Sequence, residues 1–161
     1  MYVLFIGRCH LGLNGALMTH LDSSALSILR AIFGMGVLSL VMMNWMSWTR
    51  LAGMKQEGLT LKDAGHTAQL RTRMPSKVQR VSDNYSHLFE APTAFYAVAL
   101  AIVAAGAADQ IYAICAWVFL GARVAHSLVQ ATINVVPLRL TFYLVSWAAL
   151  AVMIVRGILT I

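Results

Sequence analysis

Residues 80–100 read RVSDNYSHLFEAPTAFYAVAL, and this stretch decides how the whole chain folds. It opens with charged and polar residues, and from Ala91 to Ala108 it then carries no charge. A helix needs about 20 mostly apolar residues to cross a bilayer, so the polar opening belongs to a membrane-spanning helix. Because lipid cannot solvate such side chains, we expect them to face other helices or a wet cavity.

The composition of the complete chain agrees with a membrane protein. Of its 161 residues, 60% are hydrophobic and only 11% are charged, whereas a soluble domain averages about 25% charged residues. The two cysteines, Cys9 and Cys115, cannot form a disulfide framework. These features exclude an ordinary soluble domain and indicate a protein that crosses the bilayer several times.

The hydrophobic runs predict one all-α integral membrane domain over residues 26–161, a four-helix transmembrane bundle. The spans are expected at about residues 26–49, 82–107, 111–134 and 138–159. Pro92 predicts a kink near the start of the apolar part of the second span. Arg156 lies close enough to the end of the fourth span to snorkel to the membrane surface. Residues 1–25 form an N-terminal extension, in which translation is hypothesised to begin at Met18.

The connection at residues 50–80 is polar and basic, and a short amphipathic helix is expected within it around residues 59–70. It holds seven of the twelve Lys and Arg residues of the chain: Arg50, Lys55, Lys62, Arg71, Arg73, Lys77 and Arg80. Basic loops stay in the cytoplasm, so both termini are predicted to face outward. This distribution explains the net charge of +6 without a nucleic-acid partner.

Polar residues recur at helical spacing in the second and third spans. Positions three, four and seven apart share one face of a helix. The second span carries Arg80, Asp83, Asn84, His87 and Glu90 in this pattern, and the third carries Arg123, His126, Gln130 and Asn134. With Arg139 at the start of the fourth span, most of these residues are expected to meet near the cytoplasmic leaflet.

Two interpretations of these polar faces remain open. They could be internal contacts between helices, in which Asp83 or, most naturally, Glu90 neutralises Arg123. Asn84 and Gln130 would then form interhelical hydrogen bonds at ~0.6 kcal/mol each. They could instead form an anion or thiolate site, because Arg80, Arg123 and Arg139 outnumber Asp83 and Glu90 by one. The chain contains no HExxH or CxxC motif, so no metal site is predicted.

The motifs of both polar faces resemble those of the MAPEG family, the membrane-associated proteins in eicosanoid and glutathione metabolism. The stretch at residues 80–100 resembles the R-x-x-x-N…E…P signature of that family. The stretch GARVAHSLVQATINVVPLRLTFY, at residues 121–143, resembles its third-to-fourth helix segment. The resemblance covers most of the chain from about Leu26 onward, and the form of the first motif looks like a bacterial branch.

This resemblance implies a homotrimer that binds glutathione near the cytoplasmic side, between neighbouring subunits. Arg80 and Asn84 match residues that hold glutathione. Arg123 and His126 match pocket residues of the third helix, and Tyr143 matches a tyrosine near the same pocket. Arg139 matches the arginine that stabilises the glutathione thiolate, so it is the catalytic candidate. The bacterial form of the motif implies an inner-membrane location, and the outward-facing termini would then be periplasmic.

The chain departs from the family pattern at positions expected to contact glutathione. His87 stands where a glutamate is expected, and Glu90 follows three residues later. Gln130 replaces a tyrosine, and Leu140 rather than serine follows Arg139. We keep His87, Glu90 and Gln130 in the predicted cofactor-binding set.

Two functions are therefore carried forward. The first is a glutathione-dependent transferase or peroxidase acting on lipophilic substrates in the bilayer. The second is a non-catalytic membrane binding or interaction protein of the same fold whose thiol ligand has been lost or changed. The sequence gives little support to a third hypothesis, a small transporter, because the chain lacks an internal repeat or paired broken helices.

Overall fold

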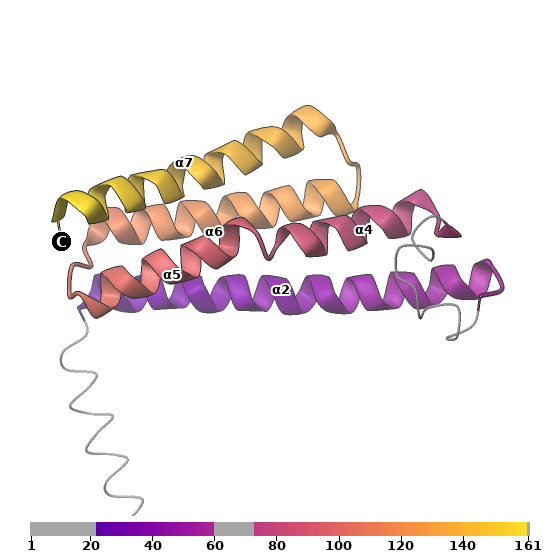
Figure 1. The fold of residues 1–161 in the computed structure, drawn as a ribbon, viewed down its shortest axis with the longest axis horizontal. Helices are drawn as coiled ribbons and strands as arrows, with labels where there is room; N and C mark the ends of the chain where they lie inside the picture. The colour runs from indigo at the N-terminus through magenta and orange to yellow at the C-terminus, as the bar shows by residue number, and fades with distance from the viewer. Residues whose placement is uncertain (1–21, 60–72, 161) are drawn as a thin grey trace, which may run out of the picture.

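The computed structural model of the chain describes residues 22–59 and 73–160 (Figure 1). The helices of these two ranges are α2 (Ser23–Gln56), α4 (Ser76–His87), α5 (Ala91–Ala104), α6 (Gln110–Ala131) and α7 (Val136–Thr160). The proposed start at Met18 and the predicted short helix, apart from Leu59, lie outside the described residues.

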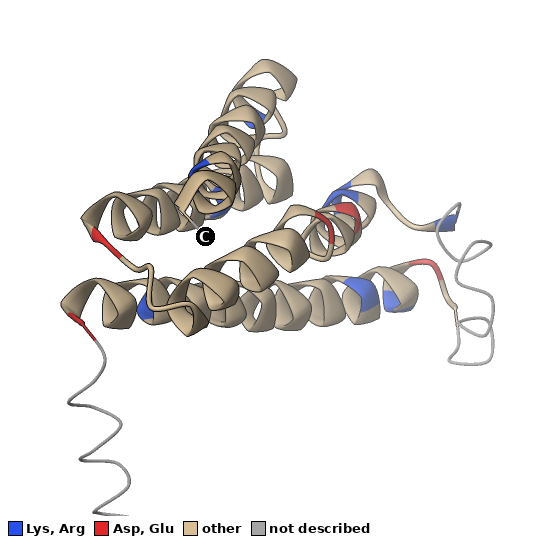
Figure 2. Ribbon diagram, turned by 60° about the vertical axis from the view of Figure 1, so that its left-hand side comes forward, with Lys and Arg blue, Asp and Glu red and all other residues tan. Residues whose placement is uncertain are grey.

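The described helices provide four segments long and apolar enough to cross a membrane: α2, α4 with α5, α6, and α7. The predicted all-α four-helix transmembrane fold is therefore confirmed. α6 contacts α2, α4 and α7, and Figure 1 shows it between α7 and the α4–α5 pair. In Figure 2, long stretches of α2 carry no charged residue, and α5 carries no charged residue at all. Spanning helices require such uncharged stretches.

The first span is longer than its predicted range, since α2 continues to Gln56 instead of ending near residue 49. Its last turns pack against the start of α4, where Met54, Met74 and Val78 form a small apolar cluster. A Cβ on Gly53 would lie 3.0 Å from Val78 Cγ2 and 3.1 Å from Met74 Sδ, so the glycine permits this close approach. This packing accompanies the extension of α2 into residues 50–56, which the polar composition of the sequence had placed in the connection.

The apolar core lies between α2, α5, α6 and α7. Phe95 of α5 and Phe119 of α6 stack with ring centroids 4.3 Å apart, and both are fully buried. Met35 of α2 and Leu150 of α7 are also fully buried in this cluster. Without a hydrophobic driving force in lipid, such close packing is what holds the helices together.

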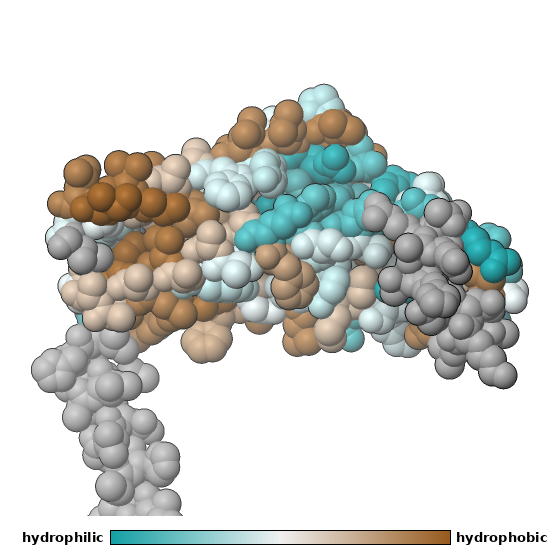
Figure 3. Space-filling model, in the orientation of Figure 1, coloured by the Kyte–Doolittle hydropathy of each residue, from teal (hydrophilic) through white to brown (hydrophobic). Residues whose placement is uncertain are grey.

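The outer surface combines a lipid-compatible part with a polar part. Phe33 and Trp48 of α2 and Ile158 of α7 are each at least 74% exposed, and exposed apolar surface of this extent is typical of membrane contact. Figure 3 shows hydrophilic residues gathered on the half of the visible face nearer the α6–α7 turn. The chain is an integral multi-pass membrane protein, and the polar half directs attention to that end of the bundle.

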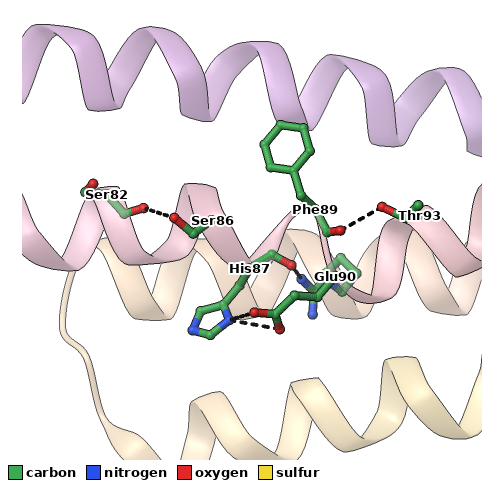
Figure 4. Close-up of polar contacts among 7 residues, drawn as sticks. Ser82, Ser86, His87, Phe89, Glu90 and Thr93 are labelled. Carbon is green, nitrogen blue, oxygen red and sulfur yellow. Dashed lines mark hydrogen bonds and ion pairs between the residues drawn. The ribbon is translucent and has the colours of Figure 1, made fainter. Parts of the chain in front are cut away.

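The second span is interrupted at residues 88–90, between α4 and α5, which agrees with the kink expected near Pro92. Proline has no N–H to continue the helical hydrogen bonding, so nearby carbonyl groups lose their usual partners. The Thr93 hydroxyl donates to the Phe89 carbonyl at 2.7 Å and satisfies one of them (Figure 4). The break changes the direction in which the following side chains point.

The opposite end of the bundle is closed by an ion pair. Asp109 caps α6 by accepting a hydrogen bond from the Tyr112 backbone N–H at 3.0 Å. Its carboxylate also binds Arg156 of α7 through two contacts of 2.7 and 2.8 Å. The hydrogen bond from Arg156, followed by that from Tyr112, lowers the pKa of Asp109 to about 2. Arg156 thus joins two spans instead of only snorkelling.

Candidate functional site

A pocket of about 170 Å³ lies where the end of α4, the end of α6 and the start of α7 meet. Its lining consists of His87, His126, Gln130, Val136, Arg139, Leu140 and Tyr143. Five of the nine site residues predicted from the sequence are in this lining: His87, His126, Gln130, Arg139 and Tyr143. The remaining four, Arg80, Asn84, Glu90 and Arg123, are outside it.

Arg139 enters the pocket from the first turn of α7. Its Nη1 donates a hydrogen bond to Asn134 Oδ1 at 3.1 Å. Asn134 has a φ of 52° in the turn between α6 and α7, a conformation that asparagine tolerates better than most residues. Among the described residues, Arg139 has no carboxylate within ion-pair distance, so its positive charge is not neutralised.

His126 of α6 is 4% exposed and contacts the same arginine by a different route. Its Nδ1 lies 2.9 Å from the backbone carbonyl oxygen of Arg139. Its ring centroid lies 5.9 Å from that of Tyr143, which is also on α7. His126 Nε2 and Gln130 Oε1 are buried and have no hydrogen-bond partner among the described residues. These two atoms are available to a bound molecule or to water.

His87 and Glu90 form a pair at the break between α4 and α5. His87 Nδ1 lies 3.1 Å from both carboxylate oxygens of Glu90 (Figure 4). The two side chains are 42% and 55% exposed. The ion pair between Glu90 and Arg123, which one of the two interpretations included, is not formed: Glu90 lies at the surface beside His87, whereas Arg123 is completely buried.

Arg123 supports the broken span from the interior. Its Nη2 donates a hydrogen bond to the His87 carbonyl oxygen at 2.7 Å, at the end of α4 where the helix dipole is negative. Its guanidinium carbon lies 5.9 Å from the centre of the Tyr143 ring. Arg123 therefore contacts two residues of the pocket lining without lining the pocket itself.

Arg80 and Asn84 are also displaced from the pocket. Arg80 Nη1 donates to the backbone carbonyl of Thr132 at 3.2 Å, which joins the start of α4 to the end of α6. Asn84 is completely buried, and both polar atoms of its amide lack a partner among the described residues. Arg80 and Asn84, the two residues expected to hold glutathione, therefore lie outside the pocket: Arg80 binds the end of α6, and Asn84 is buried inside the bundle.

One lining residue of the pocket, Val136, and one buried polar residue outside the lining, Ser127, were not predicted from the sequence. Val136 lines the pocket beside Arg139, and nothing distinguishes it from the other apolar residues of the chain. Ser127 is completely buried and its hydroxyl has no partner among the described residues. Its position four residues after Arg123, on the same helix face, was a signal that could have identified it.

The residues that line the pocket are suited to binding an anion rather than a metal ion. No group of three or more His, Cys, Asp or Glu residues that could hold a metal occurs in the described ranges. The lining supplies one arginine and two histidines, and it contains no carboxylate. An acidic molecule would meet donors and positive charge there.

The family comparison adds an independent result. The model of the MAPEG family matches residues 28–159, which is most of the chain and includes every residue of the pocket lining. Searches among curated proteins and among solved structures gave no match. The match confirms the resemblance that the two polar motifs suggested, and the chain belongs to the MAPEG family.

Proposed function

We propose that the protein is a glutathione-dependent transferase or peroxidase that directs a bound glutathione thiolate against lipophilic electrophiles. One observation carries this proposal: the pocket combines the unneutralised guanidinium of Arg139 with the unpartnered Nε2 of His126. Members of the MAPEG family include glutathione-dependent enzymes, so the proposal agrees with the family.

The residues present fit an acidic thiol. Glutathione would supply a sulfur nucleophile whose free pKa of about 8.5 leaves it mostly protonated at neutral pH. A guanidinium within a few ångströms favours the ionised form of such a group. Arg139 is suited to this role because its hydrogen bond to the neutral Asn134 amide orients it and leaves its charge available. Gln130 Oε1 could accept a hydrogen bond from the ligand.

The size of the pocket supports a homotrimer. A volume of about 170 Å³ is below the range of about 300–1,000 Å³ that is typical of small-molecule sites. The polar half of the surface in Figure 3 would also be unfavourable against lipid tails. A neighbouring subunit would enlarge the pocket and cover that surface. Glutathione would enter from the cytoplasm, and the lipophilic substrate would arrive from the bilayer.

The positive-inside rule supports an orientation for this assembly. Basic residues concentrate in the last turns of α2, the start of α4 and the connection between them, so that end of the bundle would be cytoplasmic. Both termini would then be periplasmic in a bacterial inner membrane.

Specific observations also favour the alternative, a non-catalytic binding protein of the same fold. Arg80 is engaged by Thr132, and Asn84 is completely buried. His87, which stands where the family carries a glutamate, is paired with Glu90. These three positions would contribute less to glutathione binding than in an enzyme that keeps the family pattern. A different anionic ligand would still find Arg139 and His126.

Melting temperature across a glutathione titration separates the two functions. A ligand that binds only the folded state raises stability by RT ln(1 + [L]/Kd). We expect a dose-dependent rise in the detergent-purified protein that is lost in Arg139→Ala. Arg30→Ala is a matched control, because Arg30 is exposed and lies outside the pocket lining. If the wild-type protein shows no shift at cytosolic glutathione concentrations, the alternative function is favoured.

Activity assays complete this experiment. A wild-type protein that shows the shift should consume glutathione when given a lipophilic aryl halide or a fatty-acid hydroperoxide. Arg139→Ala should lose that turnover, whereas Arg30→Ala should keep it. Binding without turnover of any electrophile would indicate the non-catalytic function.

A further inference from the structure

We infer that His126 Nε2 is the base that removes the proton from the thiol of the bound ligand. This inference rests on the proposed function and assigns the proton transfer to a particular atom. It starts from a buried ring nitrogen in the pocket lining that has no partner among the described residues.

The hydrogen bond on the other side of the ring fixes the proton positions. A backbone carbonyl oxygen can only accept, so the 2.9 Å contact between His126 Nδ1 and the Arg139 carbonyl requires a proton on Nδ1. In a neutral imidazole one nitrogen carries the proton and the other is an acceptor. Nε2 is therefore the acceptor in the neutral ring, and it is the nitrogen able to take another proton.

One residue of α7 would organise both halves of the reaction. The backbone carbonyl of Arg139 holds His126 in the reactive tautomer, and the side chain of Arg139 carries the positive charge in the same pocket. A displacement of the first turn of α7 would disturb the base and the cation together. This coupling follows from the contact between helices and is not visible in the spacing of the sequence.

The titratable and charged groups around His126 come from three elements. Arg123 is on its own helix, Arg139 and Tyr143 are on α7, and His87 comes from the end of α4. The carboxylate of Glu90 is bound to His87. A proton on Nε2 would therefore find its counter-charge in the ligand sulfur rather than in a protein carboxylate.

The proton balance of the step is simple. The S–H bond of the ligand breaks, its electron pair stays on sulfur, and its proton forms an N–H bond at His126 Nε2. The result is an imidazolium beside a thiolate, which is the arrangement that activates thiol nucleophiles next to histidine. Arg139 adds a second positive charge, and no oxidant or further reactant is needed. The proton later leaves with the leaving group or enters the solvent.

Calorimetry of glutathione binding tests this assignment. Titrations at neutral pH in two buffers of different ionisation enthalpy give the number of protons released per glutathione bound. The ultraviolet absorbance of the thiolate gives the number of thiolates formed in the same complex. If His126 keeps the proton, the wild-type protein should form thiolate while releasing close to no protons to the buffer.

The matched variants are His126→Asn and His126→Gln. The Asn amide can place an N–H near the position of Nδ1, so it can retain the contact with the Arg139 carbonyl while removing the base. We expect the ratio of protons released to thiolates formed to rise from near zero to near one in His126→Asn. His126→Gln also lacks a basic nitrogen and should give the same ratio. It replaces His126→Asn in the experiment if that variant does not fold.

The possible failures are distinguishable. A ratio near one in the wild-type protein would show that the proton goes directly to solvent and would overturn this inference while leaving the proposed function intact. A ratio near zero in the wild-type protein and in either folded variant would assign the proton to another group and would also overturn it. Absence of binding heat in the wild-type protein would refute the proposed function and this inference together.

Discussion

The arginines at the two ends of the bundle bind different kinds of acceptor. At the α5–α6 end, Arg156 makes two contacts of 2.7 and 2.8 Å with the Asp109 carboxylate. At the pocket end, Arg123 binds the His87 carbonyl and Arg139 binds the Asn134 amide oxygen, and both of these acceptors are neutral. A carboxylate cancels the charge of an arginine, whereas a neutral acceptor only orients it. The comparison therefore separates a structural end from an end equipped to attract an anion.

The largest effect on stability is expected when Arg123 is replaced by Met. The substitution removes the buried guanidinium that donates to the His87 carbonyl at the helix break, and it leaves that carbonyl without this partner. Loss of a buried hydrogen bond to a charged group costs ~1.5–3 kcal/mol. Reversible unfolding in mixed detergent micelles would measure the loss, and Arg123→Lys should restore part of it. An unchanged free energy of unfolding would show that Arg123 does not support the break.

A smaller effect, dependent on pH, is expected at the opposite end. The pKa of Asp109 in the folded protein, about 2, is below the ordinary value of 3.8 for this group. The stabilisation is therefore complete above about pH 3.8 and is lost as the pH falls through about 2. Because both partners are partly exposed, solvent screening keeps the contribution modest.

The melting temperature of the wild-type protein should therefore fall toward that of Asp109→Asn across this acidic range. Above it, Asp109→Asn should melt at a lower temperature than the wild-type protein and should keep its response to glutathione. A loss of that response would contradict the separation of the two ends.

The smallest effect is expected for Glu90→Gln. The contact between His87 and Glu90 is about half exposed and is an ion pair only when His87 is protonated, and exposed ion pairs are worth ~0.2–1 kcal/mol before further screening by salt. Thermal melts at low and high ionic strength should show a slight destabilisation that salt reduces. A loss as large as that of Arg123→Met would mean that Glu90 stabilises the helix break itself.

Several parts of the fold could be predicted because the bilayer imposes strong constraints on sequence. Long apolar runs located the four spans, and Pro92 indicated the region in which the second span breaks. The end of α2 could not be located in this way. Its extension to Gln56 depends on packing of Gly53 against Met74 and Val78, residues more than twenty positions away.

The candidate site was only partly predictable, because helical spacing shows which residues share a face but not what that face contacts. His126, Gln130 and Arg139 do meet in one pocket, as the polar spacing suggested. Asn84 has the same spacing but is completely buried outside the pocket. Glu90 was assigned to a continuous helix, and the break at residues 88–90 leaves it exposed beside His87.

The sequence alone determined that the protein spans the membrane four times and that its polar residues concentrate in particular spans, because lipid cannot accommodate scattered charges. It also determined the family, through two motifs in the correct order. Only the tertiary structure decided which arginine is neutralised, which carbonyl Arg123 binds, and which nitrogen of His126 carries a proton. These outcomes depend on contacts between helices, and the rotation and offset of the helices are set by packing rather than by local spacing.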